Sequence, residues 1–184
     1  TRTRSKNTSL NHASPVIFLF PEDERIPVAS STNHEVAHTV EYAYMGAYLD
    51  SVTSWIWWME GCATWMTSYA DGDVSAWGRD ASDYTEFPHL ALHHRVAAFL
   101  IPEQSAHMYG TAILAQFIDE QYGGSDAVRA TWEYGATVTG DVVWFPDAIA
   151  SAGIDFDEFW THYMARLTTI DLVHGALVTA VTLT

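Results

Sequence analysis

The chain has 184 residues, and 23 Asp and Glu against 8 Lys and Arg give a formal net charge of −15 at pH 7. Its 48% hydrophobic and 14% aromatic content is enough for a packed core, which excludes wholesale disorder. The few, scattered basic residues argue against nucleic-acid binding. No apolar run reaches the roughly 18 residues that a membrane span requires, so we expect no membrane insertion. The strongly acidic balance predicts a secreted, extracellular protein, with a saline environment as one option.

The first predicted elements are a strand and a helix. Residues 1–14 are polar and are expected to be irregular, whereas the apolar run at residues 16–20 predicts a buried strand. Thr32, with Glu35 three residues later, forms a capping box that predicts the start of a helix. This helix should end near Met45, just before a glycine.

Helical patterns dominate the rest of the chain, and glycine and proline mark their ends. The predicted helices cover about residues 53–70, about 89–100, 107–122, a stretch from Ser125, a short stretch from 140 with a kink at Pro146, and one capped by Asp155. We therefore expect a mainly α fold (α+β), with a small or vestigial β element near the N-terminus. These patterns give no indication of the oligomeric state.

The segment that points to chemistry is H-E-x-x-H at residues 34–38. On a helix, His34 and His38 lie one turn apart on the same face, so their two imidazoles can bind one ion. Glu35 projects beside them, where it can reach a water bound to the metal. Zinc lowers the pKa of such a water towards 7, and the carboxylate takes its proton. The alternative is a solvated helix with two surface histidines, and the predicted helix start at this position favours the metal.

A catalytic zinc site needs three protein ligands and an open position. Glu41 lies about 10 Å along the helix axis from His34, which is too far for it to share an ion with both histidines. We expect it to support the site from outside the ligand set or to lie on the surface. Glu60 is the stronger candidate, because a charge inside such an apolar helix must be paired. Its partner is either a metal or an arginine.

The H-E-x-x-H segment followed by W-M-E-G-x-A at residues 58–63 resembles the gluzincin metallopeptidases. In that clan a second helix delivers a glutamate to the zinc ion, often within an E-G-x-A segment. The resemblance implies a helical zincin-like catalytic domain with one catalytic Zn²⁺ bound by His34, His38 and Glu60. It also implies Glu35 as the general base. The same pairing is similar to that of compact minimal gluzincins and of secreted bacterial and archaeal metalloprotease-like domains.

A second, looser similarity concerns residues 107–114, which resemble the tyrosine-containing helix of gluzincin aminopeptidases. The resemblance implies that Tyr109 stabilises the oxyanion through its phenol, with His107 as the second choice. A tyrosine that only packs in the core is the alternative. The chain lacks the G-A-M-E-N type of segment that recognises a free amino terminus. That absence favours an endopeptidase over an aminopeptidase.

The predicted function is therefore a zinc-dependent peptidase acting on peptide or protein substrates. We expect one domain over residues 1–184, with the zinc-site helices and strand at about 15–70 and a helical lobe at about 85–170. Two alternatives come from other classes. One is a catalytically inactive zincin-like binding or surface domain, and the other is a zinc hydrolase with a non-peptide substrate.

Other polar or reactive residues give weaker signals. His89 and His93 are one helical turn apart but have no carboxylate at a telling spacing, so a second metal there is disfavoured. The acidic loop at residues 71–83 lacks a full calcium-loop pattern and leaves room only for weak Ca²⁺ binding. Cys62 is the single cysteine, so it cannot form an internal disulfide, and we expect a small core residue.

Overall fold

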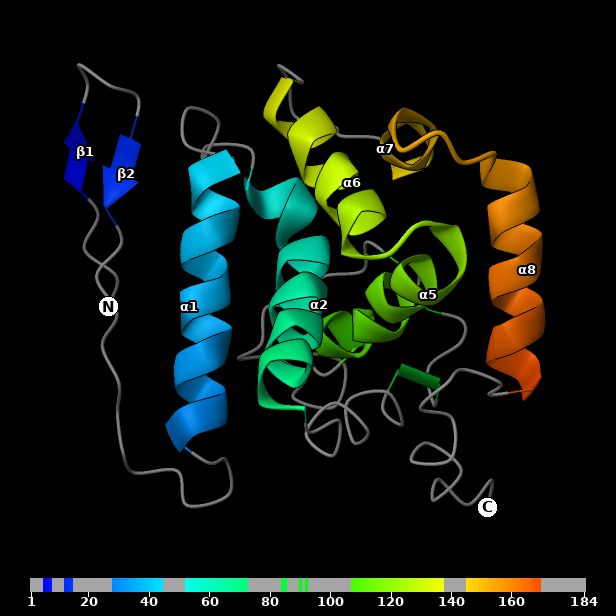
Figure 1. Ribbon diagram of the computed structural model, residues 1–184, viewed down its shortest axis with the longest axis horizontal. Coiled ribbons are helices and arrows are strands. Elements are labelled where there is room, and N and C mark those ends of the chain that lie inside the picture. The colour runs from blue at the N-terminus through cyan, green and yellow to red at the C-terminus, as the bar shows by residue number, and fades with distance from the viewer. Residues whose placement is uncertain are drawn as a thin grey trace.

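The computed structural model describes residues 5–7, 12–14, 28–44, 52–72, 84–85, 90, 92, 107–137 and 145–169. This part of the chain is mainly α, with six helices and one short strand pair, which confirms the expected helical class (Figure 1). Several predicted features lie outside the described residues: the strand at 16–20, most of the helix at 89–100 with His89 and His93, and nearly all of the acidic loop at 71–83.

Two adjacent helices, α1 (Val28–Tyr44) and α2 (Val52–Asp71), lie side by side (Figure 1). Helix α2 matches its prediction, and Gly72 follows it with a φ of 63° that suits glycine. Helix α1 begins a full turn before Thr32, so the predicted capping box was wrong as the helix start. A proline precedes Val28 in the sequence, and proline is favoured at the start of a helix.

The N-terminal strands β1 (Ser5–Asn7) and β2 (His12–Ser14) pair antiparallel, with Ser5 opposite Ser14. They lie beside α1 (Figure 1). The prediction that residues 1–14 are irregular is wrong for these six positions. Their pairing depends on backbone hydrogen bonds between residues that are polar except for Ala13, a feature that hydropathy patterns do not signal.

The core is built around α2, which contacts α1 on one side and α5 (Ala112–Tyr122) on the other. Four tryptophans of α2 are buried in the core: Trp55, Trp57, Trp58 and Trp65. The indole N–H of Trp58 donates a 3.1 Å hydrogen bond to Thr131 Oγ1 of α6 (Ser125–Thr137). Most side chains of α2 are buried. Glu60 is the charged residue in the middle of this apolar helix.

The C-terminal part consists of α5, α6, α7 (Phe145–Ser151) and α8 (Phe156–Thr169). Two glycines with positive φ, Gly123 and Gly124, separate α5 from α6, as predicted. Pro146 is the second residue of α7, so it helps to start that helix and does not kink it. Asp155 caps α8, because its Oδ1 accepts a 2.9 Å hydrogen bond from the Glu158 backbone N–H.

The predicted helix at residues 107–122 is interrupted. Residues 107–110 form one helical turn, Thr111 breaks the pattern, and α5 continues from Ala112. Among the described helices, none is long and apolar enough to cross a membrane.

Candidate metal centre

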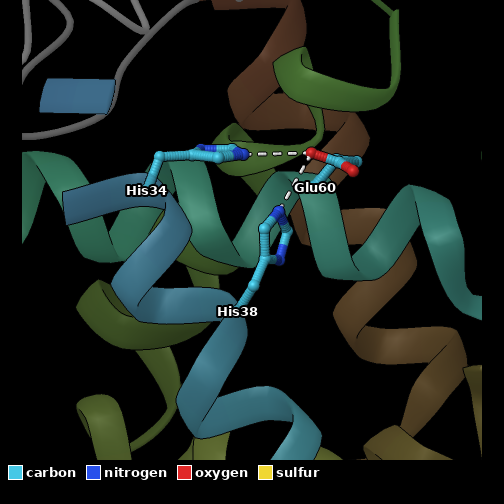
Figure 2. Close-up of side chains that lie close together, drawn as sticks. All are labelled: His34, His38 and Glu60. Carbon is cyan, nitrogen blue, oxygen red and sulfur yellow. Dashed lines mark hydrogen bonds and ion pairs between the residues drawn. The ribbon is translucent and has the colours of Figure 1, made fainter. Parts of the chain in front are cut away.

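Helices α1 and α2 bring His34, His38 and Glu60 together. Figure 2 shows both imidazoles of α1 directed at the carboxylate of α2. Glu60 Oε2 lies 3.0 Å from His34 Nε2 and 3.3 Å from His38 Nε2. One possible ligand atom from each residue lies within 4.8 Å of the other two. The three residues that we predicted as metal ligands therefore form one cluster that could hold a metal ion.

The local structure explains this convergence. The i, i+4 spacing on α1 stacks the two imidazoles edge to face, with ring centroids 4.7 Å apart. Glu60 reaches them from α2, where its neighbour Met59 is buried in the core. Side-chain exposure is 20% for His34, 15% for Glu60 and only 2% for His38. The cluster therefore opens towards solvent on the side of His34 and is closed behind His38.

The donor atoms fit a bound cation. Two ligand atoms that are each about 2.1 Å from a tetrahedral ion lie about 3.4 Å apart, which is close to the two separations between Glu60 and the histidines. His38 Nε2 is buried and faces Glu60 Oε2 at 3.3 Å. A ring nitrogen lone pair and a carboxylate oxygen repel each other at this distance. A proton or a metal ion between them removes that repulsion.

In the absence of a metal, protons supply the positive charge. Burial by itself favours the neutral imidazole of His38, but hydrogen bonds to Glu41 and Glu60 and the charges of both carboxylates outweigh it. The pKa of His38 is raised from 6.5 to about 9. Burial likewise opposes the charge on Glu60, yet hydrogen bonds and charge interactions with His34 and His38 lower its pKa from 4.5 to about 2. The charges within the cluster therefore favour a cation at this position.

Glu41 is buried, with 1% of its surface exposed, and its Oε2 lies 2.6 Å from His38 Nδ1. It therefore supports the site from behind a histidine, and the alternative surface position is excluded. The prediction that it does not join His34 in binding the ion agrees with the ligand cluster, which contains Glu60 instead.

The turn at residues 107–110 places its two candidate residues differently. The Tyr109 ring lies 5.9 Å from the His34 ring, centroid to centroid, and Tyr109 is half-buried. His107 is 1% exposed and stacks on Tyr84 with a centroid distance of 4.7 Å. Tyr109 is thus the residue of this turn that adjoins a candidate ligand, whereas His107 packs in the interior.

Sequence reasoning missed Thr111. Its Oγ1 lies 2.9 Å from the carbonyl oxygen of Trp57 and 2.6 Å from that of Met108, so its single O–H bridges α2 and the turn that carries Tyr109. The only signal was a β-branched hydroxyl residue within a helical pattern, and such residues often bond to nearby backbone.

The remaining site residues have simple placements. Glu35 follows His34 on α1 and is half-buried. Cys62 is fully buried, and burial raises the pKa of its thiol well above the ordinary value, so it packs as a small core residue as expected.

Comparison of the chain with models of protein families, with curated proteins and with solved structures found no match. The resemblance to gluzincins therefore rests on the motifs alone. What the fold and the site establish together is a helical protein with a His34, His38 and Glu60 triad that could hold a metal ion.

Proposed function

We propose that this protein is a zinc-dependent peptidase with its metal at His34, His38 and Glu60. The observation that supports this most strongly is the convergence of two imidazoles and a carboxylate from α1 and α2, 3.0–3.3 Å apart. Two histidines and one glutamate are a donor set that catalytic zinc sites use, with a further position left for water or substrate. The partial exposure of His34 and Glu60 provides access to that position.

A zinc ion held by these residues would lower the pKa of a coordinated water and polarise the substrate carbonyl. The chain itself supplies the proton transfer. Glu35 adjoins His34 on α1, and we assign it the role of general base that accepts a proton from the attacking water. Tyr109, beside the His34 ring, is assigned the role of donor to the developing oxyanion.

The substrate that we propose is a peptide or protein cleaved internally, because the chain lacks the segment with which related aminopeptidases recognise a free amino terminus. The net charge of −15 further supports a protein that works outside the cell, including in saline surroundings.

The decisive test combines metal analysis with peptide hydrolysis. We expect one zinc per chain and cleavage of a quenched-fluorescent peptide library. Glu35→Gln should keep zinc and lower hydrolysis by about 10²–10⁴-fold, because the amide cannot accept the proton. Glu60→Gln should lose zinc and activity together, because it weakens a ligand. Glu133→Gln makes the same chemical change at an exposed position of α6 and should alter neither property.

Three outcomes would contradict parts of this proposal. A zinc-free wild-type protein contradicts the metal site. Full activity of Glu35→Gln contradicts the role of that residue. A protein that binds zinc but cleaves no peptide in the library contradicts peptidase activity and supports a binding domain or a hydrolase of non-peptide substrates.

A further inference from the structure

Glu41 and His38 form a short, closed contact on the inner side of α1. The two residues are three positions apart on the helix, and Glu41 Oε2 lies 2.6 Å from His38 Nδ1. Each residue has only 1% of its surface exposed. A carboxylate in this position can only accept, so the Nδ1–H of His38 donates the hydrogen bond. The opposite nitrogen, Nε2, then faces Glu60.

We propose that Glu41 is a positioning residue that holds His38 in its metal-binding form. By accepting the Nδ1 proton, it fixes both the rotation of the imidazole ring and the tautomer whose Nε2 lone pair points at the metal position. This inference rests on the proposed metal centre and assigns it a fourth residue, one that contacts a ligand and not the ion.

Charge balance gives Glu41 a second effect. Burying a carboxylate is costly unless an opposite charge compensates it. Glu41 and Glu60 together bring two negative charges to the neighbourhood of His38. A divalent cation at the cluster neutralises both, and the charge of Glu41 acts through the imidazole to make Nε2 a stronger donor. The pair of carboxylates therefore favours a divalent over a monovalent ion.

Loss of the acceptor should release His38 in a specific way. Without Glu41, the ring can turn, or the neutral imidazole can carry its single proton on Nε2, from which it would donate to Glu60. That arrangement satisfies both side chains and competes directly with metal binding, because the same lone pair is consumed. The cost should therefore appear in metal affinity and in the state of His38, and not only in the stability of the fold.

The experiment compares Glu41→Gln and Glu41→Leu with wild type and with Glu133→Gln as the matched control. Zinc affinity is measured by competition with a chromophoric chelator, and the His38 Nδ1–H resonance is observed by NMR in zinc-loaded protein. Loss of such an outer hydrogen bond typically weakens metal binding by about 10–100-fold. We expect about tenfold for the glutamine variant, which keeps an acceptor, and about 100-fold for the leucine variant.

The spectra should separate positioning from a merely structural role. In wild type the Nδ1–H proton should resonate far downfield because of the short hydrogen bond. It should move upfield in Glu41→Gln and be lost to exchange in Glu41→Leu. If the leucine variant does not fold, the isosteric glutamine variant decides alone. Wild-type affinity with an unmoved resonance overturns the role of Glu41. A wild-type protein that binds no zinc overturns the proposed function itself.

Discussion

Gly61 contacts Thr111 so closely that a β-carbon at position 61 would overlap the Thr111 hydroxyl oxygen. The close packing at position 61 therefore requires a residue without a side chain. It lets the turn at residues 107–110 approach α2, and the Thr111 hydroxyl then holds that turn by its contact with the Trp57 carbonyl. The same approach brings Tyr109 to the His34 ring. The glycine of the E-G-x-A segment thus links the metal cluster to the proposed oxyanion donor.

Substitution Gly61→Ala should destabilise the protein by about 1–3 kcal/mol, the usual cost of overpacking a well-packed core. The free energy of unfolding from urea denaturation measures this cost. The double variant Gly61→Ala, Thr111→Ala should be more stable than the sum of the single effects predicts, because the second change removes the clashing hydroxyl. Strict additivity of the two changes would show that this contact does not limit the packing.

The stability of the metal-free protein should depend on pH through His38 and Glu60. The pKa of His38 is raised in the folded state from 6.5 to about 9, so its contribution is complete below about pH 6.5 and is lost as the pH rises through 9. The pKa of Glu60 is lowered from 4.5 to about 2, so its contribution is present above about pH 4.5 and is lost as the pH falls through 2. Together, His38 and Glu60 stabilise the metal-free fold most between about pH 4.5 and pH 6.5.

Bound zinc should reverse the loss of stability that the metal-free protein shows at alkaline pH, because metal binding requires the deprotonated imidazole. We therefore expect the difference in unfolding free energy between zinc-loaded and chelated protein to widen from about pH 6.5 to pH 9. Urea denaturation at several pH values, with and without a chelator, provides the measurement. The widening should vanish in Glu60→Gln, and parallel curves for wild type would contradict a metal bound through His38.

Tyr109→Phe should lower the turnover number for peptide hydrolysis by about 10²-fold or less while leaving zinc content unchanged. The phenol is the group that the substitution removes, and the ring contact with His34 remains. His107→Gln is the comparison, because His107 stacks on Tyr84 in the interior and should affect stability more than turnover. The opposite pattern, with turnover depending on His107 alone, would transfer the oxyanion role to that residue.

Salt should stabilise the protein. At neutral pH the 23 acidic residues repel one another, and about 1 M NaCl screens charges separated by more than about 3 Å. The melting temperature at about pH 7.5 should therefore rise clearly across this range. Near the sequence pI of about 4.7 the net charge is small, and the same titration should have little effect. A flat series at neutral pH would argue against a saline environment.

The ligand cluster could be predicted because two of its parts are local. The spacing of His34 and His38 places both imidazoles on one helical face, and Glu60 stands out as a charge within an apolar helix. Their convergence also depends on the packing of α1 against α2. Only the resemblance to gluzincins implied that a second helix brings its glutamate to the two histidines. Helix α2 and the glycine pair after α5 were predicted for similar local reasons.

The parts that sequence reasoning did not settle depend on distant contacts. Whether Glu41 is buried or lies on the surface depends on the packing of α1 against its neighbours. Its distance from His34 along the helix axis does not decide this. The Thr111 hydroxyl donates to a carbonyl 54 positions earlier in the chain, a contact that no local pattern signals. The start of α1 was misplaced because residues 30–32 are serines and a threonine, which are favoured capping residues, although they lie inside the helix.

All of the proposed ligands, together with Glu41, belong to one helical hairpin, and the outermost two are only 26 positions apart. Contacts of such short range close small loops, so they cost little chain entropy. During synthesis, the residues of α1 and α2 leave the ribosome before those of the turn that bears Tyr109. All of the proposed ligands, and Glu41 with them, are therefore synthesised before the residue that we propose as the oxyanion donor.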